Sequence, residues 1–167
     1  PHFQALRSGG DQLVLGEPVQ SRLNNRWLFV VGRPIWRDGR FDGAVNLLVS
    51  TDFLASVLGR LNLTPQDVVA LVHPEGRILA RSVDNLAAMA QTLPVTRPFM
   101  ADRQLAHGSF RQPGTVDDVP RLFGWHRMMP TGAVVVVGLS EEGLLTPLAQ
   151  TEQQATLLTA LLSLALA

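Results

Sequence analysis

The sequence lacks several features that would indicate particular functions. It contains no cysteine, which excludes disulfide bonds and thiol chemistry and is compatible with an oxidising compartment such as the periplasm. Its 14 basic and 14 acidic residues cancel, so the chain has no charge footprint for nucleic acid or for an anionic bilayer surface. We therefore expect no nucleic-acid partner.

The sequence also lacks the motifs that catalysis and metal binding require. Its four histidines form no His-x-His or His-x-x-x-His pair, and no Gly-rich phosphate loop is present. The segment GLSEEG, residues 138–143, is one residue too long for a nucleophile elbow, so Ser140 is expected to cap a helix. His73 lies in a hairpin turn, where we expect it to be solvated. The sequence thus predicts no catalytic residue, no metal site and no cofactor.

Short apolar runs separated by turn residues are present throughout the 167-residue chain. RWLFVVGRPIW and AVNLLVS flank an Asp-Gly turn at residues 38–39, which predicts an antiparallel hairpin. VVALVHPEGRILARS predicts a second hairpin, and GSFRQP, VPRLFGWHRMMP and AVVVVGLS are three further strand candidates. A helix is expected from the cap at Ser50 to near Asn62, and a shorter one in VDNLAAMAQTLP. These elements indicate an α+β fold, with antiparallel sheets and flanking helices.

An internal repeat is visible in the order of these elements. RWLFVVGRPIW followed by GAVNLLVSTDFL matches PRLFGWHRMMP followed by TGAVVVVGLSEEGLL in order and residue type. Each copy has an aromatic-rich strand with an arginine, a Gly-Ala-Val strand, and a serine with an acidic residue that opens a helix. The match favours a duplication. The alternative is chance, because a hairpin followed by a helix is a common unit.

The last part of the sequence changes character. After the polar run AQTEQQ, the segment TLLTALLSLALA carries no charge. Since about 20 apolar residues span a membrane, we expect a C-terminal helix over residues 149–167 that leads into a truncated transmembrane span. A terminal core helix is the alternative. The chain begins at Pro1 without a signal-peptide pattern, and we interpret it as a fragment of a longer protein.

Several stretches together resemble a known family of sensor domains. They are HFQALRS, LVLGEPVQSR, GRPIWRDGRFDGAVNLLVS, ALVHPEGRILARS and GSFRQPGTVDDVPRLFGWHRMMPTGAVVVVGLS. In their order they resemble the double Cache family, the extracytoplasmic sensor module of bacterial histidine kinases, diguanylate cyclases and chemoreceptors, whose two lobes are related to the PAS fold. The resemblance implies a membrane-distal lobe over residues 1–62, incomplete at its N-terminus, and a membrane-proximal lobe over residues 63–148.

The resemblance also implies a cellular setting. The domain would lie on the periplasmic side of the bacterial inner membrane, as part of a membrane protein with flanking transmembrane helices that is usually a homodimer. The amino acid-binding and amine-binding branches of the family use tyrosines, whereas this chain contains none. This departure argues against ligands of those two classes.

Candidate ligand residues lie on the aromatic strands. Because side chains alternate between the faces of a strand, Arg33 shares a face with Trp27 and Phe29, and Arg127 shares one with Trp125. A guanidinium among aromatic rings can bind a carboxylate; alternatively it is a structural group, salt-bridged or with its head in water. The predicted ligand-binding residues are Arg33, Trp27, Phe29, Phe3, Arg7, Asn46, Arg127 and Trp125.

The sequence therefore predicts an extracytoplasmic sensor domain. It would bind a small organic ligand, with a carboxylate as one candidate, and relay binding across the membrane to a histidine kinase or diguanylate cyclase. The alternative is a ligand-free structural spacer or dimerisation module, in which aromatic side chains close the sheet face. An enzyme ranks third, because no group in the sequence is arranged for activation.

Overall fold

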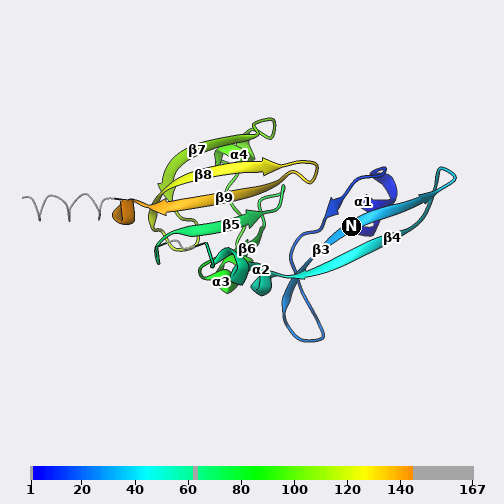
Figure 1. The fold of residues 1–167 in the computed structure, drawn as a ribbon, viewed down its shortest axis with the longest axis horizontal. Helices are drawn as coiled ribbons and strands as arrows, with labels where there is room; N and C mark the ends of the chain where they lie inside the picture. Colours follow the sequence, from blue (N-terminus) through cyan, green and yellow to red (C-terminus); the bar gives the residue numbers. More distant parts are fainter. Residues whose placement is uncertain (1, 62–63, 145–167) are drawn as a thin grey trace, which may run out of the picture.

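The computed structural model of the chain describes residues 2–61 and 64–144. These residues form two antiparallel sheets with short helices (Figure 1), which confirms the predicted α+β fold. We call residues 2–50 the first lobe and residues 64–144 the second lobe. The predicted boundary at residues 62 and 63 lies outside the described residues and stays a prediction.

The first lobe is a four-stranded sheet built around one long central strand. Its elements are α1 (His2–Ser8), β1 (Val14–Leu15), β2 (Val19–Gln20), β3 (Trp27–Arg37) and β4 (Arg40–Ser50). β3 pairs with β4 along one side and with β1 and β2 along the other. Asp38 and Gly39 both have positive φ, 50° and 74°, which closes the predicted two-residue hairpin turn with the twist that the strands require.

The helix α2 (Thr51–Leu58) follows β4 directly. The predicted cap is confirmed, because the Ser50 hydroxyl accepts a hydrogen bond from the Phe53 amide at 3.3 Å. The prediction that this helix continues to near Asn62 is wrong, because the helix ends at Leu58. Gly59 takes the C-cap position, and glycine is a poor helix former, so the apolar spacing beyond it does not extend the helix.

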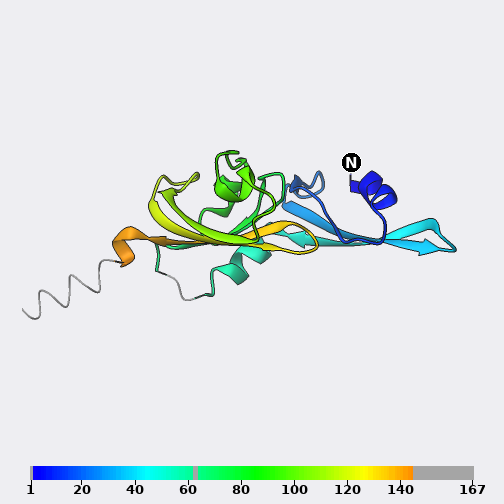
Figure 2. The same ribbon diagram turned by 90° about the horizontal axis from the view of Figure 1, so that it is seen from above.

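The second lobe is a five-stranded sheet in the order β6-β5-β9-β8-β7. Its elements are β5 (Val68–Val72), β6 (Ile78–Arg81), α3 (Asn85–Met89), α4 (Pro98–Ala101), β7 (His107–Pro113), β8 (Pro120–Met128) and β9 (Ala133–Ser140). The long connection between β6 and β7, drawn in green in Figure 2, lies over one face of this sheet. The connection contains the short helix α4, and the strand predicted in GSFRQP is β7.

The two halves of the predicted repeat have the same local structure. The hairpin β8–β9 leads into a helical turn capped by Ser140, whose hydroxyl accepts from the Gly143 amide at 2.9 Å, as Ser50 does after β3–β4. The predicted role of Ser140 is thus confirmed. β9 pairs with β5 on its second edge, whereas β4 pairs only with β3 within the described part of the chain.

The apolar core lies mainly in the second lobe. Buried apolar residues there come from the sheet and from the β6–β7 connection, and they include Val72 of β5, Phe99 of α4 and Trp125 of β8. The first lobe contributes Leu6 and Phe29. Three apolar side chains of β4 are instead largely exposed: Val45, Leu47 and Leu48.

The two lobes are joined by hydrogen bonds at two places, one through α2 and the other directly between His73 and Leu15. The Asn85 amide donates to Asp52 of α2 at 2.9 Å, and the Thr51 hydroxyl donates to the Trp27 carbonyl at 3.3 Å. The prediction that His73 is solvated is wrong: it is buried, because the turn that carries it packs against the first lobe. Its Nδ1 accepts from the Glu75 amide, so its Nε2 carries the proton and donates to the Leu15 carbonyl at 3.1 Å.

The predicted membrane-spanning segment, residues 149–167, lies outside the described residues. In the part of the chain that the structure does describe, no helix is both long enough and apolar enough to cross a membrane.

Candidate functional site

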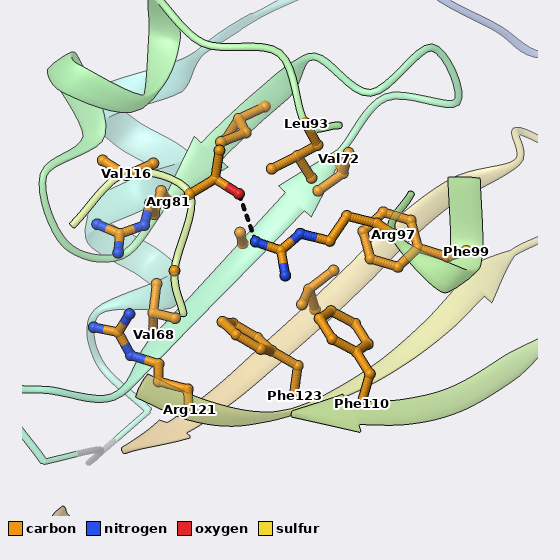
Figure 3. A pocket seen from close by; sticks show the side chains of 15 residues that line it. Val68, Val72, Arg81, Leu93, Arg97, Phe99, Phe110, Val116, Arg121 and Phe123 are labelled. Atoms are coloured by element: carbon orange, nitrogen blue, oxygen red, sulfur yellow. Dashed lines mark hydrogen bonds between the residues drawn. The ribbon is translucent and has the colours of Figure 1, made fainter. Parts of the chain in front are cut away.

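A partly enclosed cavity lies between the five-stranded sheet and the β6–β7 connection (Figure 3). It offers about 50 Å³ to the centre of a water-sized sphere. Its walls come from all five strands, from the connection and from the loop between β7 and β8. The lining residues are Val68, Ala70, Val72, Ile78, Arg81, Leu93, Arg97, Phe99, Phe110, Gly114, Thr115, Val116, Arg121, Phe123 and Val136.

Strand alternation builds the floor of the cavity. In β5, Val68, Ala70 and Val72 face the cavity, because alternate side chains share one face of a strand. Phe123 of β8 stacks on Phe110 of β7, with ring centroids 5.1 Å apart. The floor is therefore apolar, and it offers aromatic faces to whatever lies above them.

Arg97 brings a cation into this apolar cavity. It precedes α4, and Pro98 at the first helical position fixes the direction in which the chain enters the helix. The side chain is buried, with 6% exposed, and its guanidinium lies 5.3 Å from the ring centroid of Phe110 and 5.8 Å from that of Phe123. Figure 3 shows the guanidinium reaching across the cavity above the two rings.

The partners of Arg97 are all neutral. Its Nη2 donates to the Pro113 carbonyl at 2.9 Å and to the Thr115 hydroxyl at 2.7 Å, and its Nη1 donates to the Gln112 side-chain carbonyl. Within residues 2–61 and 64–144 no carboxylate forms an ion pair with it. Burial without a counter-charge accordingly lowers the pKa of Arg97.

Arg81 and Arg121, at one end of the cavity, share a single carboxylate. Asp117 accepts from Arg81 at 2.6 Å and from Arg121 at 2.8 and 2.7 Å. Burial alone would raise the pKa of Asp117, but the hydrogen bonds and charges of the two arginines outweigh it and hold that pKa well below its ordinary value. In Figure 3 the guanidinium groups of both arginines point away from that of Arg97.

The predicted residues of the first lobe do not form one site in the structure. Arg33 pairs with Asp11 at 3.1 and 3.2 Å, and its side chain is 64% exposed. Trp27 packs against the second lobe beside Ile78 and Met89. Phe29 is buried in the sheet.

Three further predicted residues lie around α1. The Asn46 side-chain oxygen is 3.1 Å from Nε2 of His2. Phe3 and Arg7 line an open hollow together with Trp36. The remaining walls of that hollow are Arg40 and Phe41.

In the second lobe, both predicted residues are buried outside the cavity wall. The ring centroid of Trp125 lies 5.7 Å from that of Phe99, and the Trp125 Nε1 has no acceptor in the described part of the chain. The Arg127 guanidinium donates to four backbone carbonyls, at distances from 2.6 to 3.4 Å. Those carbonyls belong to Leu105, Gly132, Phe99 and Asp102. Arg127 thus anchors the loops around β8.

Sequence reasoning predicted the inward face of β8 but missed Arg97. The predicted shared face of Trp125 and Arg127 on β8 is confirmed, because both are buried, and Arg121 and Phe123 continue the same face. Arg97 lies in a non-repetitive segment, where no periodicity shows which side chains turn inward. The Arg-Pro pair before a short helix is the one local signal at this position.

Comparisons with known proteins show similarity at the level of the fold. No family model matches the chain, and neither does any curated protein. Among solved structures, the extracellular domain assigned to the histidine kinase rpHK1S-Z16 is similar with a TM-score of 0.67 and 23% identity, over 86% of this chain and 60% of that one. The chain therefore spans less than two thirds of that neighbour's length.

Two chemoreceptor domains are similar to a comparable degree. The periplasmic sensory domain of Campylobacter jejuni Tlp1 has a TM-score of 0.66 and 14% identity, over 87% of this chain and 56% of that one. The ligand-binding domain of the Pseudomonas aeruginosa amino acid chemoreceptor PctB, in complex with L-Arg, has a TM-score of 0.63 and 16% identity, over 85% and 59%. These neighbours are sensor domains and not catalytic domains. The chain therefore has the Cache-like α+β fold of the extracytoplasmic sensor domains of histidine kinases and chemoreceptors.

Proposed function

We propose that the chain is the extracytoplasmic sensor domain of a bacterial inner-membrane receptor and that it binds a small organic ligand. The observation that carries the proposal is the cavity of the second lobe, which combines apolar walls with a buried cation. Small-molecule sites in proteins are built in this way, largely apolar with a few placed polar groups. The fold supports the same proposal, since the neighbours include ligand-binding domains.

A relay to the rest of the molecule starts beside the cavity. The guanidinium of Arg81 belongs to the Asp117 ion-pair cluster, and its backbone amide donates to the Asn85 side chain at 2.9 Å. Asn85 in turn donates to Asp52 of α2. A shift at the cavity wall would thus reach Asp52 of α2 through Arg81 and the Asn85 side chain. A ligand that binds one packing of the lobes more tightly would shift the population toward it.

The output of the parent protein belongs to the same proposal. A histidine kinase or a diguanylate cyclase on the cytoplasmic side would receive the shift through the C-terminal helix, and chemotaxis is a third output, represented among the neighbours. Receptors of this design would be homodimers through their transmembrane helices. Sedimentation of the full-length protein in detergent tests the dimer.

A thermal-unfolding screen tests ligand binding. The purified domain is heated with small carboxylates, amines, amino acids and purines, and the same panel is applied to Arg97→Gln and Arg33→Ala. A ligand at a hundred times its dissociation constant stabilises the folded state by about 2.7 kcal/mol. We expect at least one compound to raise the midpoint and Arg97→Gln to abolish the rise. Loss of the rise in Arg33→Ala alone would instead support the predicted site in the first lobe, which stays a prediction.

The second candidate is a ligand-free spacer or dimerisation module. It is favoured by the size of the cavity, about 50 Å³, which is small beside the roughly 300–1,000 Å³ of typical ligand pockets. The exposed apolar side chains of β4 would then serve subunit contacts. A domain that responds to no compound in the screen and still dimerises would support this candidate over the sensor.

A further inference from the structure

The cavity has an unbalanced charge. Arg97 is buried, and all its hydrogen-bond acceptors are neutral. A guanidinium has five N–H donors, and the three hydrogen bonds of Arg97 leave Nε and one N–H of Nη1 without an acceptor in the described chain. A buried cation without an anionic partner is unfavourable, and an anion placed beside it relieves that cost.

The remaining walls define the other end of the ligand. The apolar part of the lining includes Val68 and Val72 of β5 and Val136 of β9, which suit alkyl groups. None of the lining residues, all from the described part of the chain, is an aspartate or glutamate. Asp117 lies nearby, but Arg81 and Arg121 occupy its oxygens. The cavity thus offers no acceptor of matching charge to an ammonium group.

The volume limits the length of the ligand. A water-sized sphere needs roughly 10–15 Å³ by the same measure, and a cavity of about 150 Å³ holds benzene. By these two standards the 50 Å³ of this cavity accommodates roughly two to five non-hydrogen atoms. Acetate and propionate fall in this range.

We propose that the cavity binds a small monocarboxylate of the size of acetate or propionate, with its carboxylate on Arg97 and its alkyl end against the valines of β5 and β9. The proposal rests on the proposed function, because it names the ligand class of that same site. Thr115 adds a second contact. Its hydroxyl accepts from Arg97 at 2.7 Å, which leaves its own proton to donate to the carboxylate.

The same arrangement rejects α-amino acids. An amino acid such as glycine or alanine is similar in length but would place an ammonium group in a cavity that already holds a cation. Desolvating that group without an anionic partner disfavours binding strongly. The specificity would therefore differ from that of the neighbour PctB, whose structure contains L-Arg.

Isothermal titration with acetate, propionate, glycine, alanine and ethylamine, in buffer free of other carboxylates, tests the proposal. We expect acetate and propionate to bind, and the three amines to bind at least roughly tenfold more weakly. Arg97→Gln should abolish binding. Ala70→Val extends a side chain into the cavity and should weaken the binding of acetate and propionate roughly tenfold. This variant keeps the test decisive if Arg97→Gln fails to fold. The matched control is Arg103→Gln, which removes an exposed arginine of the same connection that pairs with Glu75 and should leave binding unchanged.

The outcomes separate this proposal from the one on which it rests. Binding of glycine or alanine as tight as that of propionate would overturn the ligand class and keep the sensor function. Binding of acetate that survives both Arg97→Gln and Ala70→Val would overturn the site. If no carboxylate binds but another compound stabilises the domain in the thermal screen, the ligand class is wrong and the sensor function stands. If no compound in either experiment binds, both proposals fail.

Discussion

Replacing Asp117 by asparagine would remove the carboxylate that bridges two buried arginines and leave Arg81 only its longer ion pair with Asp84, at 3.6 Å. The side chains of Arg81 and Arg121 are only 4% and 2% exposed, and both donate to the Asp117 carboxylate. Removal of one partner from a buried ion pair costs about 3–5 kcal/mol, because it leaves an uncompensated buried charge. Asp117 keeps some contact with solvent, at 17% exposed, so we expect about 3 kcal/mol, near the lower end.

Urea unfolding followed by circular dichroism measures the change. The midpoint should fall while the slope with denaturant stays the same, which indicates lost stability and not a changed unfolded state. The pKa of Asp117 is depressed in the folded state, so its stabilising effect is complete above the ordinary aspartate pKa of about 3.9 and disappears as the pH falls toward the folded pKa. The difference between the wild type and Asp117→Asn should therefore be constant near neutral pH and shrink below about pH 4.

The adjacent residue supplies the matched control. Asp118 is exposed and has a positive φ of 54°, a conformation that asparagine tolerates as well as aspartate. Asp118→Asn should thus change the free energy of unfolding by less than about 0.5 kcal/mol. If Asp117→Asn costs no more than this control, or if its effect persists undiminished into acid, the ion-pair cluster does not stabilise the fold as argued.

Three other predictions concern single contacts. Arg127→Met should lower the free energy of unfolding by at least about 3 kcal/mol, since four backbone carbonyls lose a donor and each unsatisfied buried group costs roughly 1–3 kcal/mol. Calorimetry measures this loss, and a smaller value would mean that water replaces the side chain. Ser50→Ala and Ser140→Ala should each cost about 1 kcal/mol by chemical denaturation, and equal stability of both variants and the wild type would show that the caps are not needed. Arg33→Ala should leave the melting temperature unchanged, because its pair with Asp11 is exposed and screened by solvent, and a large fall would assign Arg33 a structural role.

Much of the fold could be predicted because the relevant signals are local. The Asp38–Gly39 turn, the Ser50 cap and the alternation along β8 each depend on a few adjacent residues, and each is confirmed. The predicted end of α2 was wrong because the apolar spacing continued past Gly59, whereas the helical backbone ends at Leu58. Local chemistry thus predicted where elements begin better than where they end.

The candidate site was harder to predict because it depends on contacts that are distant in the sequence. An arginine in an aromatic strand can face a ligand or a carboxylate on another segment, and the partner of Arg33, Asp11, lies 22 residues away. Arg97 becomes a cavity residue only when β7 and β8 bring Phe110 and Phe123 beneath it. His73 is buried because the first lobe covers it, which its own turn does not indicate.

The concentration of the core in the second lobe has a consequence for hydrogen exchange. β4 pairs with one neighbour in the described chain and keeps Val45, Leu47 and Leu48 largely exposed, whereas β9 pairs on both edges within a packed sheet. Opening the β3–β4 hairpin would therefore expose little additional apolar surface, and its amides can exchange through local fluctuations. The amides of β5 and β9 require the unfolding of the whole second sheet. Deuterium uptake should accordingly proceed in two tiers, with the hairpin labelled long before the sheet that surrounds the cavity.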